Sequence, residues 1–118
     1  MSIAIGGVSF DGPEPLVHAR LPYTPGLYML GLSSGYGDEE AFEPLVVDHC
    51  DSLAEAVRLR EARVRRYLWE RPGALIWVAS CPLSAGWGPG QRDLLVERVR
   101  RFIAEAKRRR GDWKGRRR

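Results

Sequence analysis

Residues 25–37 read PGLYMLGLSSGYG, an apolar segment that lies between glycines and contains Tyr28. The run LYMLGLS predicts a β-strand over residues 27–33, with leucine and methionine side chains on alternating sides. Two more apolar runs predict strands, PLVVDHC over 44–50 and ALIWVASC over 74–81. Neither run has a polar face, which indicates that both strands are buried on both sides.

Two helices follow from the periodic pattern. The first begins at Ser52, which has capping-box spacing to Glu55, and Pro72–Gly73 ends it near residue 70. Its apolar stripe is formed by Leu53, Val57, Val64 and Leu68. The second helix is predicted over residues 91–109. Its core stripe is formed by Leu95, Val99, Phe102 and Ala106, and is widened by Leu94 and Ile103.

The N-terminal segment predicts less structure. IAIGGVSF, residues 3–10, indicates a short strand or edge segment interrupted by glycines. DGPEP then predicts a turn, because two prolines prevent continued pairing, and residues 16–19 are expected to be extended. The element order β-β-β-α-β-α predicts an α/β (α+β) domain over residues 1–107. We expect a small mixed or antiparallel sheet of three to four strands covered by two long helices.

Composition restricts the class of protein. The chain has 118 residues, 44% of them hydrophobic, which suits one globular domain. No apolar run approaches the roughly 18 residues of a membrane helix, and the N-terminus lacks the features of a signal peptide. We therefore expect a cytoplasmic protein without a membrane partner. Cys50 and Cys81 lie in apolar runs and are interpreted as small buried hydrophobic residues.

Charge is distributed unevenly along the chain. Residues 1–50 carry one basic and seven acidic residues, whereas residues 51–107 carry eleven basic and seven acidic ones. Residues 108–118 carry seven basic residues and one acidic one, and form a basic, flexible tail in this interpretation. Arginines can displace counterions from phosphate, so the tail predicts contact with DNA or RNA, with a merely solvated terminus as the alternative. The candidate nucleic-acid-binding residues are Arg108, Arg109, Arg110, Trp113, Lys114, Arg116, Arg117 and Arg118.

The consecutive residues Asp48, His49, Cys50 and Asp51 are the densest group of potential ligands and nucleophiles. In a strand, neighbouring side chains point to opposite faces, so at most two of the four can converge. No paired Cys or His motif completes a metal site, and no nucleophile elbow or phosphate loop is present. We expect neither a metal nor a covalent active site here.

Several short motifs resemble the GIY-YIG nuclease superfamily, and are most similar to a small bacterial branch of it. They are GGVSFDGP at 6–13, PGLY at 25–28, PLVVDHCDSL at 44–53 and RDLLVE at 92–97. The resemblance implies a tyrosine that positions the attacking water, a helix arginine that neutralises phosphate charge, and a glutamate on the last helix that holds a divalent ion, Mg²⁺ or Mn²⁺.

This chain retains only part of the set of tyrosine, arginine and glutamate that the resemblance implies. Tyr28 matches the tyrosine, but Asp48 stands where the second motif has glycine. The arginine position falls on Ala56, with Arg58 and Arg60 close by, and the glutamate position falls on Val96, next to Glu97. A one-residue shift turns a helical side chain by about 100°, so a neighbour does not automatically substitute. We therefore interpret Tyr28 as a structural or binding residue.

Three functions remain open. The first is a degenerate GIY-YIG-like domain that binds nucleic acid or protein without catalysis or a cofactor. The second is a metal-dependent endonuclease that uses Tyr28, Arg58 or Arg60, and Glu97. The third is an accessory protein-binding subunit without nucleic-acid contact. Trp77 is predicted to be core, while Trp69 and Trp87 are candidates for exposed binding residues.

Overall fold

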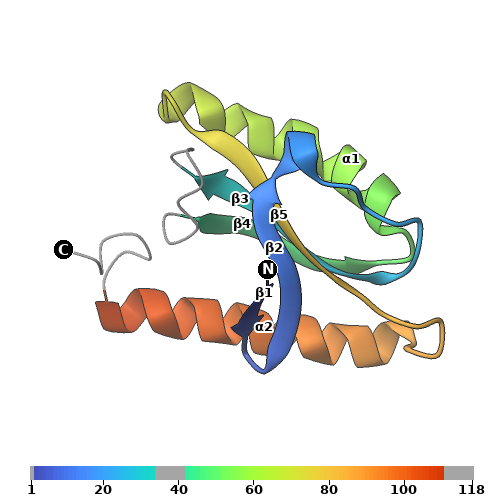
Figure 1. Ribbon diagram of the computed structural model, residues 1–118. Coiled ribbons are helices and arrows are strands. Elements are labelled where there is room, and N and C mark those ends of the chain that lie inside the picture. Colours follow the sequence, from blue (N-terminus) through green and yellow to red (C-terminus); the bar gives the residue numbers. More distant parts are fainter. Residues whose placement is uncertain (1, 34–41, 111–118) are drawn as a thin grey trace.

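The computed structural model describes residues 2–33 and 42–110. Within these ranges, five strands form one antiparallel sheet in the order β1-β2-β5-β3-β4. The strands are β1 (Ser2–Ile5), β2 (Val8–Pro15), β3 (Gly26–Ser33), β4 (Glu43–Cys50) and β5 (Leu75–Pro82). Helix α1 (Leu53–Arg65) covers one face of the sheet and α2 (Pro89–Arg110) covers the other (Figure 1). The predicted α+β class is confirmed.

The N-terminal segment is a β-hairpin, so the sheet has one strand more than the sequence predicted. Gly6 and Gly7 connect β1 to β2 with φ angles of 61° and 82°, and Ile5 pairs with Val8 across this turn. Two central residues with positive φ match the twist of the flanking strands, which explains why glycines stand here. The turn packs against α2, since a Cβ on Gly6 would lie 2.8 Å from the carbonyl oxygen of Arg98.

The prediction that DGPEP ends strand pairing was wrong. β2 continues to Pro15, with a register shift between Asp11 and Glu14. Among the described residues, β1 pairs with residues 8–11 of β2 and nothing pairs with that side of β2 beyond Asp11, so a missing N–H there costs no ladder bond. The expected extended segment at 16–19 was wrong too, because Leu16–His18 form the short 3₁₀ helix η1.

The three strands predicted from apolar runs are all present. β3 pairs with both β4 and β5, and its residues are buried throughout. β5 lies between β2 and β3, and is buried over residues 76–80. β4 is an edge strand and most of its residues are only half-buried, so the expected burial on both faces was wrong for this strand.

Both helices have the predicted positions. The Ser52 side chain accepts a hydrogen bond from the Glu55 amide at 3.4 Å, which confirms the N-cap. The last turn of the predicted first helix is the 3₁₀ helix η3 (Arg66–Glu70). α2 continues through Arg110, so residues 108–110 belong to the helix rather than to a tail.

Two hydrophobic clusters lie on the two faces of the sheet. The cluster under α1 contains the predicted stripe of Leu53, Val57 and Val64, and Leu68 packs against it. The cluster under α2 contains Trp77, as predicted, and three residues of α2, namely Val96, Val99 and Ile103. The predicted stripe of α2 is rotated, since Leu94 is 67% exposed and Phe102 is 45% exposed.

Candidate functional site

Tyr28 lies in the middle of the sheet, on the face that α1 covers. Its cross-strand neighbours are Asp48 on β4 and Ser80 on β5, so the three side chains share that face. The side chain of Tyr28 is 1% exposed and belongs to the cluster under α1. A phosphate group or a metal ion in solvent therefore has no access to the ring.

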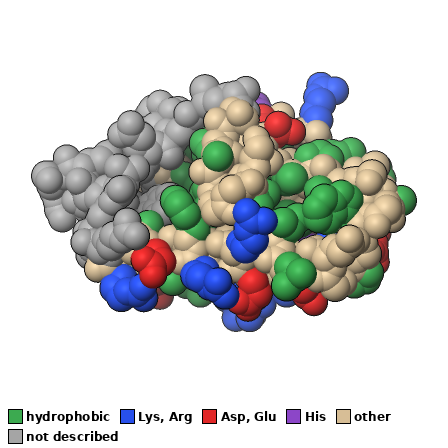
Figure 2. All heavy atoms as spheres, turned by 90° about the horizontal axis from the view of Figure 1, so that it is seen from below, with side chains coloured by type: hydrophobic (Ala, Val, Ile, Leu, Met, Phe, Trp, Pro, Cys, Tyr) green, Lys and Arg blue, Asp and Glu red, His purple; other side chains and the backbone are tan. Residues whose placement is uncertain are grey.

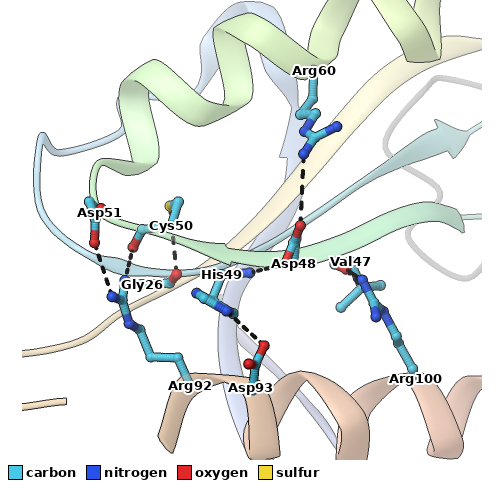
Figure 3. Close-up of polar contacts among 10 residues, drawn as sticks. All are labelled: Gly26, Val47, Asp48, His49, Cys50, Asp51, Arg60, Arg92, Asp93 and Arg100. Atoms are coloured by element: carbon cyan, nitrogen blue, oxygen red, sulfur yellow. Dashed lines mark hydrogen bonds and ion pairs between the residues drawn. The ribbon is translucent and has the colours of Figure 1, made fainter. Parts of the chain in front are cut away.

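Arg60 connects the tyrosine to a carboxylate. It descends from α1 and its Nη2 lies 3.9 Å from Asp48 Oδ2 (Figure 3), and it is near enough to the Tyr28 phenol to affect the pKa of that group. Burial raises the pKa of Tyr28, the polar interaction with Arg60 and its charge lower it, and the Asp48 carboxylate raises it again. The net pKa is raised above its ordinary value, so the phenol stays protonated at physiological pH.

The four predicted catalytic residues are divided by the sheet. Tyr28 and Arg60 meet under α1, but Arg58 is exposed on the outside of that helix. Glu97 is exposed on α2, on the opposite face, where Arg101 lies 3.8 Å from its carboxylate. Its neighbour Val96 is buried in the core.

The residues around Glu97 do not fit a divalent metal ion. In the described ranges, no group of three or more His, Cys, Asp or Glu side chains is close enough to hold one. A single carboxylate that already faces an arginine is a poor ligand set for Mg²⁺ or Mn²⁺, which prefer several oxygen ligands.

The acidic and nucleophilic residues at the end of β4 also diverge. Asp48 faces α1, whereas His49 faces α2 and its Nε2 lies 2.8 Å from Asp93 Oδ1 (Figure 3). This confirms the expected alternation. Burial raises the pKa of the Cys50 thiol, and burial followed by the nearby Asp11 charge raises that of Cys81. Both cysteines are half-buried, free and poorly suited to nucleophilic attack at neutral pH.

Two arginines attach α2 to edge strand β4, and sequence reasoning gave neither of them a role. Arg92 is 4% exposed, donates to the Cys50 carbonyl and lies 3.0 Å from Asp51 Oδ1. Arg100 donates to the Val47 carbonyl through Nε at 3.2 Å and Nη2 at 2.6 Å (Figure 3). Position 92 lies on the same helical line as Val96 and Val99, which is the one sequence signal for its burial.

The α2 face of the molecule carries charges of both signs. Figure 2 shows Lys and Arg side chains beside Asp and Glu side chains on this face. Arg101 lies near Glu97 and Arg108 lies 2.5 Å from Glu105, so Arg108, a predicted nucleic-acid contact, has an acidic partner. Of the other predicted nucleic-acid contacts, those at residues 113–118 lie outside the described residues. The side chains of residues 109 and 110 are not among those described either.

The outer side of α1 and η3 differs from the α2 face. Arg58, Arg63 and Arg66 are exposed, and within the described ranges none of them forms an ion pair. Trp69 is 89% exposed and Tyr67 is 45% exposed. Trp69 and Trp87 were both predicted to be candidates for exposure, and Trp87 is 39% exposed.

Comparison of the chain with protein-family models, with curated proteins and with solved structures yields no match. In the part of the chain that the structure describes, no helix has the length and apolar character needed to cross a membrane.

Proposed function

We propose that this chain is a non-catalytic nucleic-acid-binding module with a GIY-YIG-like arrangement of elements. The order β3, β4, α1, β5, α2 is the order on which the resemblance in the sequence rests. The observation that carries the proposal is the division of the four candidate catalytic residues by the sheet. Tyr28 is buried under α1 beside Arg60, whose side chain is 42% exposed, while Glu97 is exposed to solvent on the opposite face of the sheet.

Electrostatics supports nucleic acid as the partner. The formal net charge is +4 and the sequence pI is about 9.5, and the last eleven residues carry a large share of the positive charge. Positive charge on exposed side chains binds phosphate by releasing counterions, whatever the base sequence. The expected binding is therefore weakly sequence-specific and strongly dependent on salt.

The test measures binding of the full chain to fluorescently labelled DNA and RNA at about 50 and 200 mM salt. We compare the wild type with a variant in which Arg116, Arg117 and Arg118 are changed to glutamine. Changing the same three residues to lysine is the matched control, because it keeps the charge. We expect affinity to fall steeply with salt, to drop in the glutamine variant and to persist in the lysine variant.

The same samples, incubated with Mg²⁺ or Mn²⁺, report on catalysis. Cleavage that disappears in Tyr28→Phe would overturn the non-catalytic assignment and favour the endonuclease. Absence of any binding at low salt would overturn nucleic-acid binding altogether and favour the protein-binding subunit.

A further inference from the structure

Four exposed residues form one row along the outside of α1 and η3. Leu59 and Arg63 are four residues apart in α1, and Arg66 and Trp69 follow at intervals of three. Side chains three or four residues apart are neighbours on an α-helix, and those three apart eclipse each other in a 3₁₀ helix. We call Leu59, Arg63, Arg66 and Trp69 the α1–η3 row.

The two arginines of the α1–η3 row are available for a ligand. Arg65, their neighbour, pairs with Glu61, and Arg60 lies near Asp48. By contrast, Arg63 and Arg66 have no ion-pair partner in the described ranges, although α1 and η3 both carry glutamates. Two adjacent cations that have no ion-pair partner among the described residues attract anions.

Trp69 adds a flat aromatic surface beside these charges. Its side chain is 89% exposed, and Tyr67, two residues earlier, is 45% exposed. Leu68, which lies between them, packs into the cluster under α1, and the Arg71 amide donates to the Leu68 carbonyl at 3.2 Å. The backbone that carries the ring is thus held in place.

We infer that the α1–η3 row binds single-stranded nucleic acid, with Trp69 stacked on an unpaired base and Arg63 and Arg66 contacting the adjacent phosphates. This inference rests on the proposed function and specifies its ligand class. The rise per residue places Trp69 about 10 Å along the helix from Arg63, a length that a few nucleotides span. Combining cationic and aromatic side chains is the common way of binding single strands without sequence preference.

The exposed ring is the reason for choosing single strands over duplexes. In a duplex, the faces of the bases are covered by their stacked neighbours, and a side chain reaches only the grooves and the phosphates. The arginines of the row suit either form, but Trp69 gains a partner only from an unpaired base. The row is also far from the α2 face, where charges of both signs are present (Figures 1 and 2).

The experiment titrates the full chain with a labelled mixed-sequence RNA, as a single strand and as a duplex of the same sequence. Trp69→Ala is the main variant, and Trp69→Phe restores an aromatic face. Trp87→Ala, which removes a tryptophan before α2, is the matched control. Circular dichroism and thermal unfolding verify that each variant is folded, which we expect for Trp69 because of its exposure.

We expect Trp69→Ala to weaken single-strand binding by about 5- to 100-fold, the range that loss of one base–aromatic stack gives. Trp69→Phe should retain most of the affinity, and duplex binding should be unchanged. Intrinsic fluorescence should be quenched by the single strand in the wild type and in Trp87→Ala, but far less in Trp69→Ala. Changing Arg63 and Arg66 to glutamine should weaken binding to both forms and reduce the salt slope.

Two results would overturn this inference while leaving the proposed function intact. One is single-strand binding by Trp69→Ala that equals the wild type. The other is an equal loss for single strand and duplex, which would exclude base stacking. If the full chain binds neither form at low salt, the proposed function and this inference both fail.

Discussion

The helices α1 and α2 cover opposite faces of one sheet, and both are rich in arginine, yet their arginines serve different purposes. On α2, Arg92 and Arg100 donate to carbonyls of β4, and Arg101 and Arg108 lie near glutamates of their own helix. On α1 and η3, Arg58, Arg63 and Arg66 are exposed and have no ion-pair partner among the described residues. Arg92 and Arg100 thus hold α2 on the sheet, whereas Arg58, Arg63 and Arg66 leave a charged surface on the outside of α1 and η3.

This difference has a structural cause. α2 runs beside β4, an edge strand whose carbonyls are not all used by β3, and such unpaired edge groups favour association with other strands. Long side chains that donate to these carbonyls satisfy them and block the edge. α1 lies mainly over β3, an interior strand whose backbone groups are paired on both sides, and its outward-facing arginines are directed away from the sheet.

The first prediction tests the α2 side of the comparison and has the largest expected effect. Arg92→Ala should lower the free energy of unfolding by about 2–3 kcal/mol, because it removes charge-assisted hydrogen bonds and leaves the Cys50 carbonyl without its donor. Urea-induced unfolding measures the change. Arg101→Ala, on the same helix but exposed, is the control and should cost less than about 1 kcal/mol. Equal losses for both variants would show that α2 does not depend on Arg92.

The second prediction concerns the polar contact under α1. Tyr28→Phe should lower the free energy of unfolding by about 0.5–1.5 kcal/mol, since the ring still fills its space but Arg60 loses its polar interaction with the phenol. Tyr67→Phe, on the exposed η3, should be nearly neutral in the same urea titration. If Tyr28→Phe leaves the free energy of unfolding unchanged, the Tyr28–Arg60 contact does not stabilise the fold.

Sequence patterns predicted the centre of this fold better than its margins. Strands β3 and β5 and the Ser52 cap follow from local signals, namely continuous apolar runs and a capping spacing, and all are present. The Gly6–Gly7 pair was interpreted as an interruption, although two glycines between apolar residues also indicate a hairpin. The prolines of β2 led to the prediction that strand pairing ends there. The sequence does not reveal that β1 stops pairing before these prolines, which leaves one side of the strand without a partner among the described residues.

The candidate site was harder to predict because it depends on which face each helix covers. The apolar stripe of a helix indicates that it packs on a sheet, but the connection decides on which side, so the separation of Glu97 from Tyr28 had no local signal. The contact between Tyr28 and Arg60 depends in the same way on α1 crossing above β3. Arg92 was missed because a buried arginine breaks an apolar stripe, although it occupies the central line of that stripe.

The third prediction compares the two faces through their cysteines, Cys50 on the α1 side and Cys81 on the α2 side. Burial raises the pKa of both thiols above the ordinary 9.0, so the folded state keeps protons that the unfolded state loses. Stability should therefore be fully present below pH 9 and should decline as pH rises further. Because both thiols are only half-buried, the decline should be modest.

The measurement for this prediction is the free energy of unfolding at pH 7 and at several values above 9, for the wild type and for Cys50→Ala and Cys81→Ala. Each variant should lose less stability than the wild type over the alkaline range. If a variant loses stability with pH as steeply as the wild type, the cysteine that it lacks does not contribute to the pH dependence. Comparing the two variants shows which face of the sheet excludes water more completely.

The smallest effect on the free energy of unfolding is expected on the outside of α1 and η3. It tests whether the exposed arginines there stabilise the fold or serve a ligand. Changing Arg63 and Arg66 to glutamine should alter the free energy of unfolding by at most about 0.5 kcal/mol, as for most exposed substitutions. The sign should be neutral or stabilising, because two like charges one helical turn apart repel each other. A urea titration beside Arg92→Ala measures this. A loss above about 1 kcal/mol would place these arginines among the interactions of the fold and remove the ground for a ligand there. If the fold is indifferent to them, two adjacent cations beside an exposed tryptophan are best explained by a partner that carries negative charge.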